Sequence, residues 1–445
     1  MDSIGNILYT KYRQLFRPLV KNGNILFDGV ADWFVFSLFV LPTYFGVRLI
    51  FFDLTALRFF EVLMLVGIFR SSKRKKEFLG MIKRCNNKWF IALYLFVVIY
   101  TNLLRGELNP IFYWITNGVF VFFLVSYLVL FEYGVEKFLK KIRIYLWIIV
   151  TISPLELIIK RPPFSFLDTL GKSSVNQRFG STRIMGNCST TNGYAMFLMI
   201  LLPLLWYDFE KNKIDISKNK FLTILIAINI FLTGSRLTIG TLILAFILCY
   251  IMQTRDVFLK NSIVLIIIVP ILCLVIYMNR DVEFFRSIIR TFLSAVDEVL
   301  GSSYSVAYGA EEATLYNSTF YRELLWKNTI LGDWLNPWFG RGGGYNLNMY
   351  IQGYYIRSCD NYYVAQYIAY GIPGVITWIM MSLSFFIDMI YVFMKRNFLG
   401  YAIGVSFVCY FVSLWYLDHL QTFPIMMSLF GLIYAMKNVK CETIS

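Results

Sequence analysis

Residues 220–253 read KFLTILIAINIFLTGSRLTIGTLILAFILCYIMQ, two apolar runs joined by a short turn that contains Gly234 and Arg236. A helix that spans a bilayer needs about 20 mostly apolar residues, and each run comes close to that length. Of the 445 residues, 58% are hydrophobic and 16% are charged. A soluble domain is about 45–50% apolar and about 25% charged, so this chain has more apolar surface than its own interior can hide. The sequence therefore predicts an all-α polytopic membrane protein.

Apolar windows of this kind recur along the chain, and we predict about 12 transmembrane helices. They cover residues 31–51, 52–69, 89–104, 110–131, 143–159, 192–207, 220–235, 237–253, 262–279, 364–394, 398–416 and 421–436. The window at 364–394 is longer than one span, so we expect its start to lie outside the membrane. The predicted organisation is five spans within 1–159, a first outer loop at 160–192, four spans within 193–279, a large outer loop at 280–363, and three spans with a tail within 364–445.

Basic residues set the predicted orientation, because cytoplasmic loops of membrane proteins are enriched in Lys and Arg. The chain has 42 Lys and Arg against 27 Asp and Glu, a net charge of +15. These cations gather in alternate loops, of which residues 70–88 are the richest. Both termini are therefore predicted to be cytoplasmic. The rule also explains the net charge without a nucleic-acid partner.

Arginine on the opposite side of the membrane needs a different explanation. The two long outer loops and one outer turn carry, among other cations, Arg178, Arg183, Arg236, Arg322 and Arg341. A guanidinium group presents a planar fork of donors that fits phosphate in a bidentate way. An anionic partner is therefore expected, and snorkelling of these side chains to lipid headgroups is the alternative.

The large outer loop is expected to be partly helical. Apolar residues recur at helical spacing from Phe284 to Val296, which predicts an amphipathic helix lying on the bilayer or packed against the body of the protein. A second amphipathic stretch covers residues 319–330. A run of glycines at 340–344 follows, suited to close approach to a phosphate or sugar, or simply to a tight turn.

Four short segments lie at the outer ends of predicted spans. They are Arg178-Phe-Gly-Ser-Thr-Arg-Ile-Met-Gly-Asn187 with Asn192, Leu232-Thr-Gly-Ser-Arg236, Arg322 and Trp326 followed by Phe339-Gly-Arg-Gly-Gly-Gly344, and Cys359-Asp-Asn-Tyr-Tyr363 followed by Tyr370-Gly-Ile-Pro-Gly374. In this order, the segments resemble motifs of the O-antigen polymerase and ligase superfamily of bacterial envelope polysaccharide enzymes. The resemblance covers residues 170–395.

The resemblance implies an integral-membrane glycosyltransferase with a GT-C-like fold. Such an enzyme moves a glycan from undecaprenyl pyrophosphate to an acceptor hydroxyl outside the bacterial cytoplasmic (inner) membrane, with its active site facing the periplasm or cell exterior. Ligases of the superfamily have a His directly before the Asn of the last motif, whereas this chain has Asp360 before Asn361. We therefore expect a polymerase of O-antigen or a related surface polysaccharide.

The acceptor of such a polymerase is the sugar end of an undecaprenyl-pyrophosphate-linked repeat unit. A ligase of the same fold and a lipid-linked oligosaccharide flippase or transporter are the alternatives. The resemblance implies membrane lipid and the undecaprenyl-pyrophosphate-linked oligosaccharide as partners. It also implies a chain-length regulator and a flippase as partner proteins.

Transfer of this kind needs a base for the acceptor hydroxyl and cations for the departing pyrophosphate. Asp360 is the first candidate base, with a helix N-cap as the alternative role, and Asp418 with His419 is the second candidate pair. The predicted substrate-binding residues are Arg236, Arg178, Arg183, Arg322, Arg341, Asn361 and Tyr362. Clustered Arg can replace a divalent metal, and the outer loops lack an Asp-x-Asp motif and a zinc-type ligand set. We therefore expect no metal and no cofactor.

Two carboxylates fall inside predicted spans. Glu156 and Asp388 are functional candidates for that reason alone, because a charge in the membrane is unfavourable unless it is used or paired. We expect each of them to be buried against a Lys or Arg.

Overall fold

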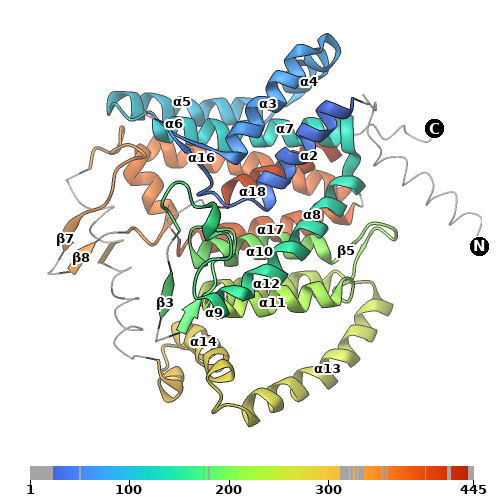
Figure 1. The fold of residues 1–445 in the computed structure, drawn as a ribbon, viewed down its shortest axis with the longest axis vertical. Helices are drawn as coiled ribbons and strands as arrows, with labels where there is room; N and C mark the ends of the chain where they lie inside the picture. The colour runs from blue at the N-terminus through green and yellow to red at the C-terminus, as the bar shows by residue number, and fades with distance from the viewer. Residues whose placement is uncertain are drawn as a thin grey trace, which may run out of the picture.

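A computed structural model shows a bundle of helices with short hairpins at its two ends (Figure 1). The structure describes residues 24–49, 52–173, 175–178, 181–310, 320, 324–325, 328, 335–351, 354–356, 358–395, 397–417 and 422–438. Three segments at the centre of the bundle are buried on almost all of their faces, namely α7 (Val121–Tyr127), α10 (Thr191–Leu205) and α18 (Phe423–Asn438). Their side chains are Leu, Met, Phe and Tyr for the most part, so an apolar core holds the bundle together.

The first part of the chain forms a series of helices that includes one unbroken helical run, Asn109–Ile159. These are α2 (Ile25–Phe39), α3 (Ala56–Arg70), α4 (Ser72–Arg84), α5 (Lys88–Leu104), α6 (Asn109–Trp114), η1 (Ile115–Phe120), α7 (Val121–Tyr127), η2 (Leu128–Tyr133), α8 (Gly134–Ile152), η3 (Ser153–Leu155) and α9 (Glu156–Ile159). Several begin at a polar side chain that accepts hydrogen bonds from the first turn. Asn24 does so for α2, Thr55 for α3 and Ser71 for α4.

The second part of the chain contains eight α-helices and two short 3-10 helices among its described residues. They are η4 (Ser165–Leu167), α10 (Thr191–Leu205), α11 (Lys220–Leu232), α12 (Arg236–Ile251), α13 (Arg255–Met278), α14 (Glu283–Leu300), η5 (Tyr304–Tyr308), α16 (Tyr362–Met394), α17 (Phe398–Ser413) and α18 (Phe423–Asn438). The amphipathic helix predicted in the large outer loop is confirmed as α14. Its buried face, which includes Arg290, Ser294 and Asp297, packs against the body of the protein at α12 and α11. The second stretch, 319–330, lies almost wholly outside the described residues.

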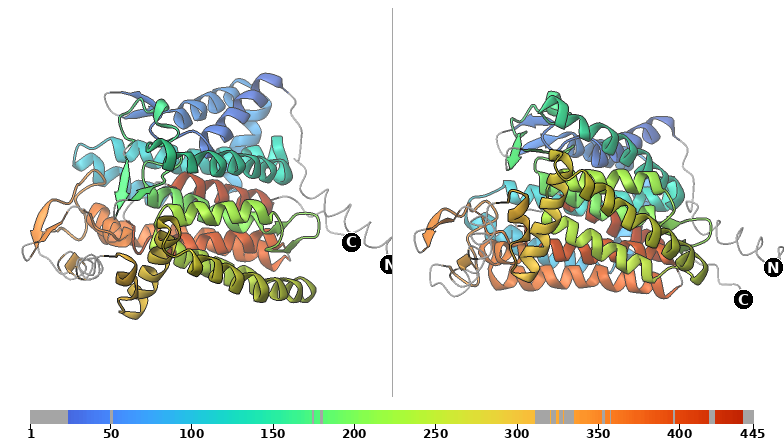
Figure 2. Two further views of the ribbon diagram at one scale, coloured as in Figure 1. Left: turned by 60° about the horizontal axis from the view of Figure 1, so that its bottom comes forward. Right: turned by 90° about the horizontal axis from the view of Figure 1, so that it is seen from below.

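Among the described residues, the strands form four separate antiparallel hairpins. They pair β1 (Gly46–Arg48) with β2 (Asp53–Thr55), β3 (Asn176–Arg178) with β4 (Ser181–Arg183), β5 (Tyr207–Asp208) with β6 (Lys213–Ile214), and β7 (Met349–Ile351) with β8 (Tyr354–Ile356). Figures 1 and 2 show β3, β7 and β8 at one end of the bundle and the β5 hairpin at the opposite end. This separation agrees with the predicted outer and inner loops, and the orientation in a bilayer stays a prediction.

The first two predicted spans, 31–51 and 52–69, are wrong in their boundaries. Helix α2 ends at Phe39, and the paired strands Gly46–Arg48 and Asp53–Thr55 come before α3 begins. Pro42 cannot donate the backbone hydrogen bond that a continued helix needs, and Arg48 and Asp53 are charged. The backbone of this segment is therefore satisfied by hairpin pairing, with Val47 opposite Leu54.

The count of 12 transmembrane helices is not confirmed. Among the described residues, two helices are long and apolar enough to cross a membrane, the run Asn109–Ile159 and α16. A third span results if α4 and α5, which are bent by 86°, count as one. The apolar helices α10, α11, α12 and α17 are shorter. The chain is thus a mostly helical protein with several apolar helices, as expected for a helical membrane protein.

Helix α16 is broken at Gly371, whose φ of 65° is open to glycine but strained for other residues. The ring of Trp378 lies 5.3 Å from that of Tyr362 and 5.5 Å from that of Tyr363. A straight helix would hold residues 362 and 378 about 24 Å apart, so the chain folds back at the break. The start of the predicted span 364–394 is therefore a separate segment, Tyr362 to Tyr370.

Candidate functional site

Helices α12 and α17 run side by side in opposite directions. The Tyr401 hydroxyl donates to the Leu248 carbonyl at 2.8 Å, and the Cys409 thiol donates to the Thr241 carbonyl at 3.5 Å. Five residues further along α17 is Leu414, and five residues back along α12 is Arg236. The start of α12, with Arg236 as its first residue, therefore lies level with the end of α17.

The starts of two more helices meet at this end of α17. The Tyr362 amide at the start of α16 donates to the Leu414 carbonyl at 2.8 Å. Helix α10 also runs antiparallel to α17, since Ser406 donates to the Ile200 carbonyl at 2.7 Å and the Phe398 amide donates to Asn212, just beyond the end of α10. The first turns of α10, α12 and α16 thus surround one end of α17.

Three helix starts bring the positive ends of three helix dipoles to this end of the bundle. Some of their first N–H groups already have partners, because Thr190 caps α10, Asn361 caps α16 and the Leu414 carbonyl accepts from the Tyr362 amide. The dipoles nevertheless favour a negative charge, which is one reason why helix starts bind phosphate groups. Arg236 adds a full charge at the same place, so this end of the bundle suits a pyrophosphate.

A second predicted cation, Arg183, is held against the turn that precedes Arg236. The Arg183 Nε donates to the Thr233 carbonyl at 2.6 Å, and the Ile184 amide donates to the Leu232 carbonyl at 3.3 Å. Gly234 has a φ of 62°, and a Cβ there would lie 3.2 Å from the Arg183 Nε. Two of the segments that carry the family resemblance therefore meet, and the glycine allows the close approach.

A buried carboxylate fixes the segment that follows Arg183. One oxygen of Glu156 accepts hydrogen bonds from the amides of Met185, at 2.7 Å, and Gly186, at 3.3 Å. The prediction that Glu156 is buried against a cation is thus wrong, because backbone amides are its partners. For Asp388 the same prediction is confirmed, since Lys437 lies 2.5 Å from its carboxylate.

Asp360 lies just before α16, in the left-handed region with a φ of 42°. Its carboxylate accepts a hydrogen bond from the Ser358 hydroxyl at 2.9 Å. The N-cap of α16 is Asn361, whose side-chain oxygen accepts from the amides of Tyr363 and Val364. The alternative role of Asp360 as the helix cap is therefore wrong, and its catalytic role stays a prediction.

The other two polar residues of this segment have partners inside the protein. Asn361 is buried and caps the helix, as described above. Tyr362 is also buried, and its hydroxyl accepts from Gln366 Nε2 at 2.6 Å, while the amide oxygen of Gln366 accepts from Tyr94 at 2.7 Å. Their predicted contacts with substrate stay predictions, and the structure adds a packing role for both.

The glycine run around Arg341 is fixed to the break in α16. The amides of Arg341 and Gly342 donate to the carbonyls of Ile368 and Ala369 at 2.7 and 2.9 Å. A Cβ on Gly371 would lie 2.3 Å from the Pro337 carbonyl oxygen, so only glycine allows the contact. The glycines of this run thus allow close packing of the backbone against α16, and their predicted contact with a phosphate or sugar stays a prediction.

The end of α5 and the turn that follows it contact the other side of the glycine run at 340–344. Asn102 Oδ1 accepts from the Gly343 amide and Glu107 Oε2 from the Gly344 amide, both at 2.8 Å. Arg105 donates to the Gly340 carbonyl at 2.9 Å. Sequence reasoning missed these three residues. Their only signal was a group of polar side chains at the end of the predicted span 89–104, with Asn102 inside the span and Arg105 and Glu107 directly after it.

Some predicted site residues cannot be placed. Arg322, Asp418 and His419 lie outside the described residues. Arg178 belongs to β3, where it pairs with Ser181 of β4, so its backbone lies two strand positions from Arg183.

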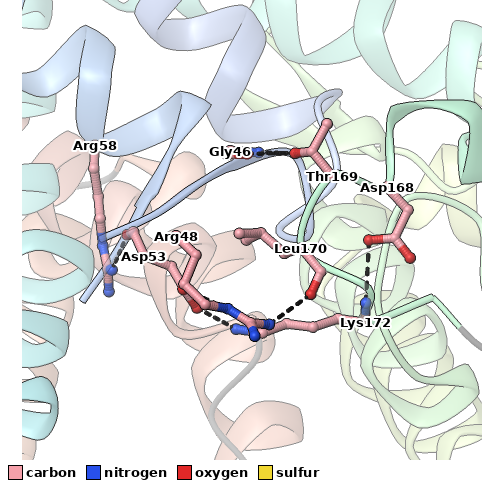
Figure 3. A network of polar contacts seen from close by, with 8 residues as sticks. All are labelled: Gly46, Arg48, Asp53, Arg58, Asp168, Thr169, Leu170 and Lys172. Carbon is pink, nitrogen blue, oxygen red and sulfur yellow. Dashed lines mark hydrogen bonds and ion pairs between the residues drawn. The ribbon is translucent and has the colours of Figure 1, made fainter. Parts of the chain in front are cut away.

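A second group of polar residues near the first outer loop is paired internally (Figure 3). Lys172 Nζ lies 2.5 Å from Asp53 Oδ2, and Arg48 donates to the Leu170 carbonyl at 2.8 Å. The Gly46 amide donates to Thr169, which ties the β1–β2 hairpin to residues 168–172. Lys172 is one of the basic residues of the outer loops, and its charge is balanced within the protein.

Asp168 shapes the turn at the end of this network. Its carboxylate accepts from the Lys172 amide at 3.1 Å, and from the amide and hydroxyl of Ser173 at 2.8 and 2.6 Å. Partial burial raises the pKa of Asp168, but these hydrogen bonds outweigh it and lower the pKa to about 2. The turn is therefore held by an ionised carboxylate.

The fold and this site define a helical membrane protein with arginines and helix starts gathered at one end of its bundle. Residues 221–379 match the family model described as O-antigen ligase, which confirms the resemblance to the O-antigen polymerase and ligase superfamily. A search of curated proteins found no match for the chain. The matched range contains Arg236 and Asp360, whereas Arg183 and the α5–α6 turn lie before it.

Proposed function

We propose that the protein is a polymerase of O-antigen or a related surface polysaccharide. It transfers a growing glycan from undecaprenyl pyrophosphate to the sugar end of an undecaprenyl-pyrophosphate-linked repeat unit. The reaction takes place on the extracytoplasmic side of the bacterial cytoplasmic membrane. A ligase of the same fold is the second candidate, because the family match supports it equally.

The observation that carries the proposal is the meeting of the starts of α10, α12 and α16 at the end of α17, with Arg236 and Arg183 beside them. A transporter would place its principal charges near the middle of the membrane. Here the segments that meet are the ends of helices, so their arrangement suits a lipid-linked pyrophosphate at the membrane surface.

The chemistry follows from these groups. The acceptor hydroxyl oxygen forms a bond to the anomeric carbon, while the bond from that carbon to the pyrophosphate oxygen breaks. The hydroxyl proton passes to the carboxylate of Asp360, and the electron pair leaves on the pyrophosphate. Arg236 and Arg183 stabilise the negative charge that develops there, so no divalent metal is required.

Asp360 is the residue that favours a polymerase over a ligase. The ligase pattern has a His directly before the Asn, and this chain has Asp360 before Asn361.

Exposed aromatic rings at Trp338 and Phe339, next to the glycine run, offer stacking surfaces for the sugars of the repeat unit.

The test is in vitro transfer with the full-length protein in lipid, one synthetic undecaprenyl-pyrophosphate repeat unit, and EDTA. Wild type is compared with Arg236→Ala and Asp360→Asn. A ladder of longer lipid-linked glycans from wild type, and none from either variant, is expected. Arg48→Ala is the matched control, since its guanidinium is engaged at the β1–β2 hairpin.

A wild type that binds the lipid yet forms no ladder would contradict the polymerase. Addition of lipid A core as acceptor then distinguishes the ligase, which would form one product of defined length. A ladder that EDTA abolishes would overturn metal independence alone.

A further inference from the structure

Helix α4 is a short amphipathic helix set across the end of its neighbour. It is bent by 86° from α5, which is largely apolar from Trp89 to Tyr100. If α5 crosses a membrane close to its normal, α4 lies in the plane of the membrane surface. Figure 1 shows α4 at the edge of the bundle, beyond α3.

One face of α4 is anchored firmly in the protein. Arg74 is buried, forms an ion pair with Glu132 at 3.3 Å, and lies over the ring of Phe27 at 3.9 Å. Phe78 is buried against Tyr127, and the Met81 carbonyl accepts from Tyr434 at 2.9 Å. Positions 74, 78 and 81 lie on one side of the helix. Their contacts therefore fix the orientation of α4 and the direction in which its opposite side points.

The opposite face is strongly basic. Its exposed cations are Lys73, Lys75, Lys76, Lys83 and Arg84. The only acidic residue within 70–88 is Glu77, which is half-buried. Exposed apolar side chains, Leu79 and Trp89, flank these cations, as they do in helices that lie at a membrane surface.

The charge of α4 excludes the hydrocarbon core as its environment. Seven of its 13 residues are charged, and each Lys or Arg is unfavourable at the bilayer centre. At the level of the headgroups the same side chains meet phosphate, for which the lysine ammonium is a compact donor. Anionic lipids at the cytoplasmic surface attract such clusters by about 1 kcal/mol for each Lys or Arg.

We propose that α4 is a docking surface for the headgroups of anionic phospholipids on the predicted cytoplasmic side of the membrane. The buried Arg74–Glu132 pair holds the helix in the membrane plane, and the lysines bind lipid phosphates. The proposal is independent of the polymerase reaction, because it concerns the end of the bundle opposite the arginine site.

The test uses the full-length protein in nanodiscs of phosphatidylcholine, with spin-labelled phosphatidylglycerol or spin-labelled phosphatidylcholine as the probe. The fraction of each probe that the protein immobilises gives the preference for the anionic lipid. Lys73→Gln/Lys76→Gln is expected to lower the affinity of these sites by about fivefold for each lysine. In about 1 M NaCl the Debye length is about 3 Å, so the preference of the wild type for the anionic lipid should fall as it does in the lysine variant.

A matched control removes the same charge elsewhere on the predicted cytoplasmic side. Lys211→Gln/Lys220→Gln changes two exposed lysines on either side of the β6 strand and should leave most of the preference. Lys73→Arg/Lys76→Arg should keep it fully. A loss in the control as large as that in α4, or no loss in the α4 variant, overturns the proposal. Displacement of the labelled lipid by soluble glycerol phosphate would also overturn it, since the site would then bind free phosphate.

Discussion

Two groups of cations in or near the outer loops differ in their surroundings. Arg236 is the first residue of α12, and Arg183 contacts the turn before it through the Thr233 carbonyl. Lys172, in contrast, is bonded to Asp53, and Arg48 of the neighbouring hairpin is bonded to the Leu170 carbonyl. The first group joins β4 to the turn before α12, and the second joins the β1–β2 hairpin to residues 168–172. We therefore expect the two groups to differ in their contribution to the reaction.

The largest expected effect separates these two groups directly. Arg183→Ala should lower kcat/KM for transfer by about 10²-fold, because a cation is lost where charge develops in the transition state. Arg48→Ala should change it less than about threefold, since exposed ion pairs contribute only about 0–1 kcal/mol. Initial rates of ladder formation in lipid measure both. Equal losses in the two variants would show that the groups do not differ in function.

A smaller effect is expected at the turn that brings Arg183 to α12. Gly234→Ala places a side chain at positive φ, which is unfavourable by about 1–2 kcal/mol, and crowds the Arg183 Nε. Both the melting temperature and kcat/KM should fall, the latter by about tenfold, which corresponds to about 1.4 kcal/mol.

Gly240→Ala is the matched control for this change. Gly240 is exposed in helix α12, and nothing lies within 4 Å of the position that a Cβ would occupy there. Alanine is favoured over glycine inside helices by about 1 kcal/mol, so this variant should melt no lower than wild type. A Gly234→Ala protein with full activity would show that the position of Arg183 is not critical.

The smallest effect concerns the pH response of the hairpin region. The pKa of Asp168 is about 2 in the folded protein, against an ordinary value of 3.8. Its contribution to the turn is therefore fully present above about pH 4 and is lost as the pH falls towards 2. Hydrogen exchange of the amides of Lys172 and Ser173, corrected for its intrinsic pH dependence, should accelerate over that interval. In Asp168→Asn the exchange should be fast at every pH and show no such transition.

The sequence predicted the helices well where apolar runs end at polar residues. Helices α11, α12 and α17 begin within one residue of the predicted windows, because Lys220, Arg236 and Asn397 mark their starts. It failed at residues 46–55, where apolar side chains on both sides of a short charged hairpin resemble a continuous span. Periodicity alone does not distinguish such a hairpin from a helix end.

The candidate site was predicted only in part, for a physical reason. Arg183, Arg236 and Asp360 could be selected by residue type and by resemblance. The partners of Glu156 could not, because they are backbone amides, which every residue has. Nor could Asn102 and Glu107, since their contacts with the glycine run join segments more than 230 residues apart.

Those last contacts have a consequence for gene exchange between proteins that match this family. The glycine run lies within the family-matched part of the chain, but Asn102, Arg105 and Glu107, which hold it, come from the less recognisable first half. Consider a recombinant that inherits residues 221–379 from one strain and the first half from another. Its glycine run and the α5–α6 residues that contact the run then come from different proteins. If these residues differ between the strains, their hydrogen bonds do not form as a matched set. Functional hybrids should carry the crossover point before residue 102, or else retain all three of these side chains.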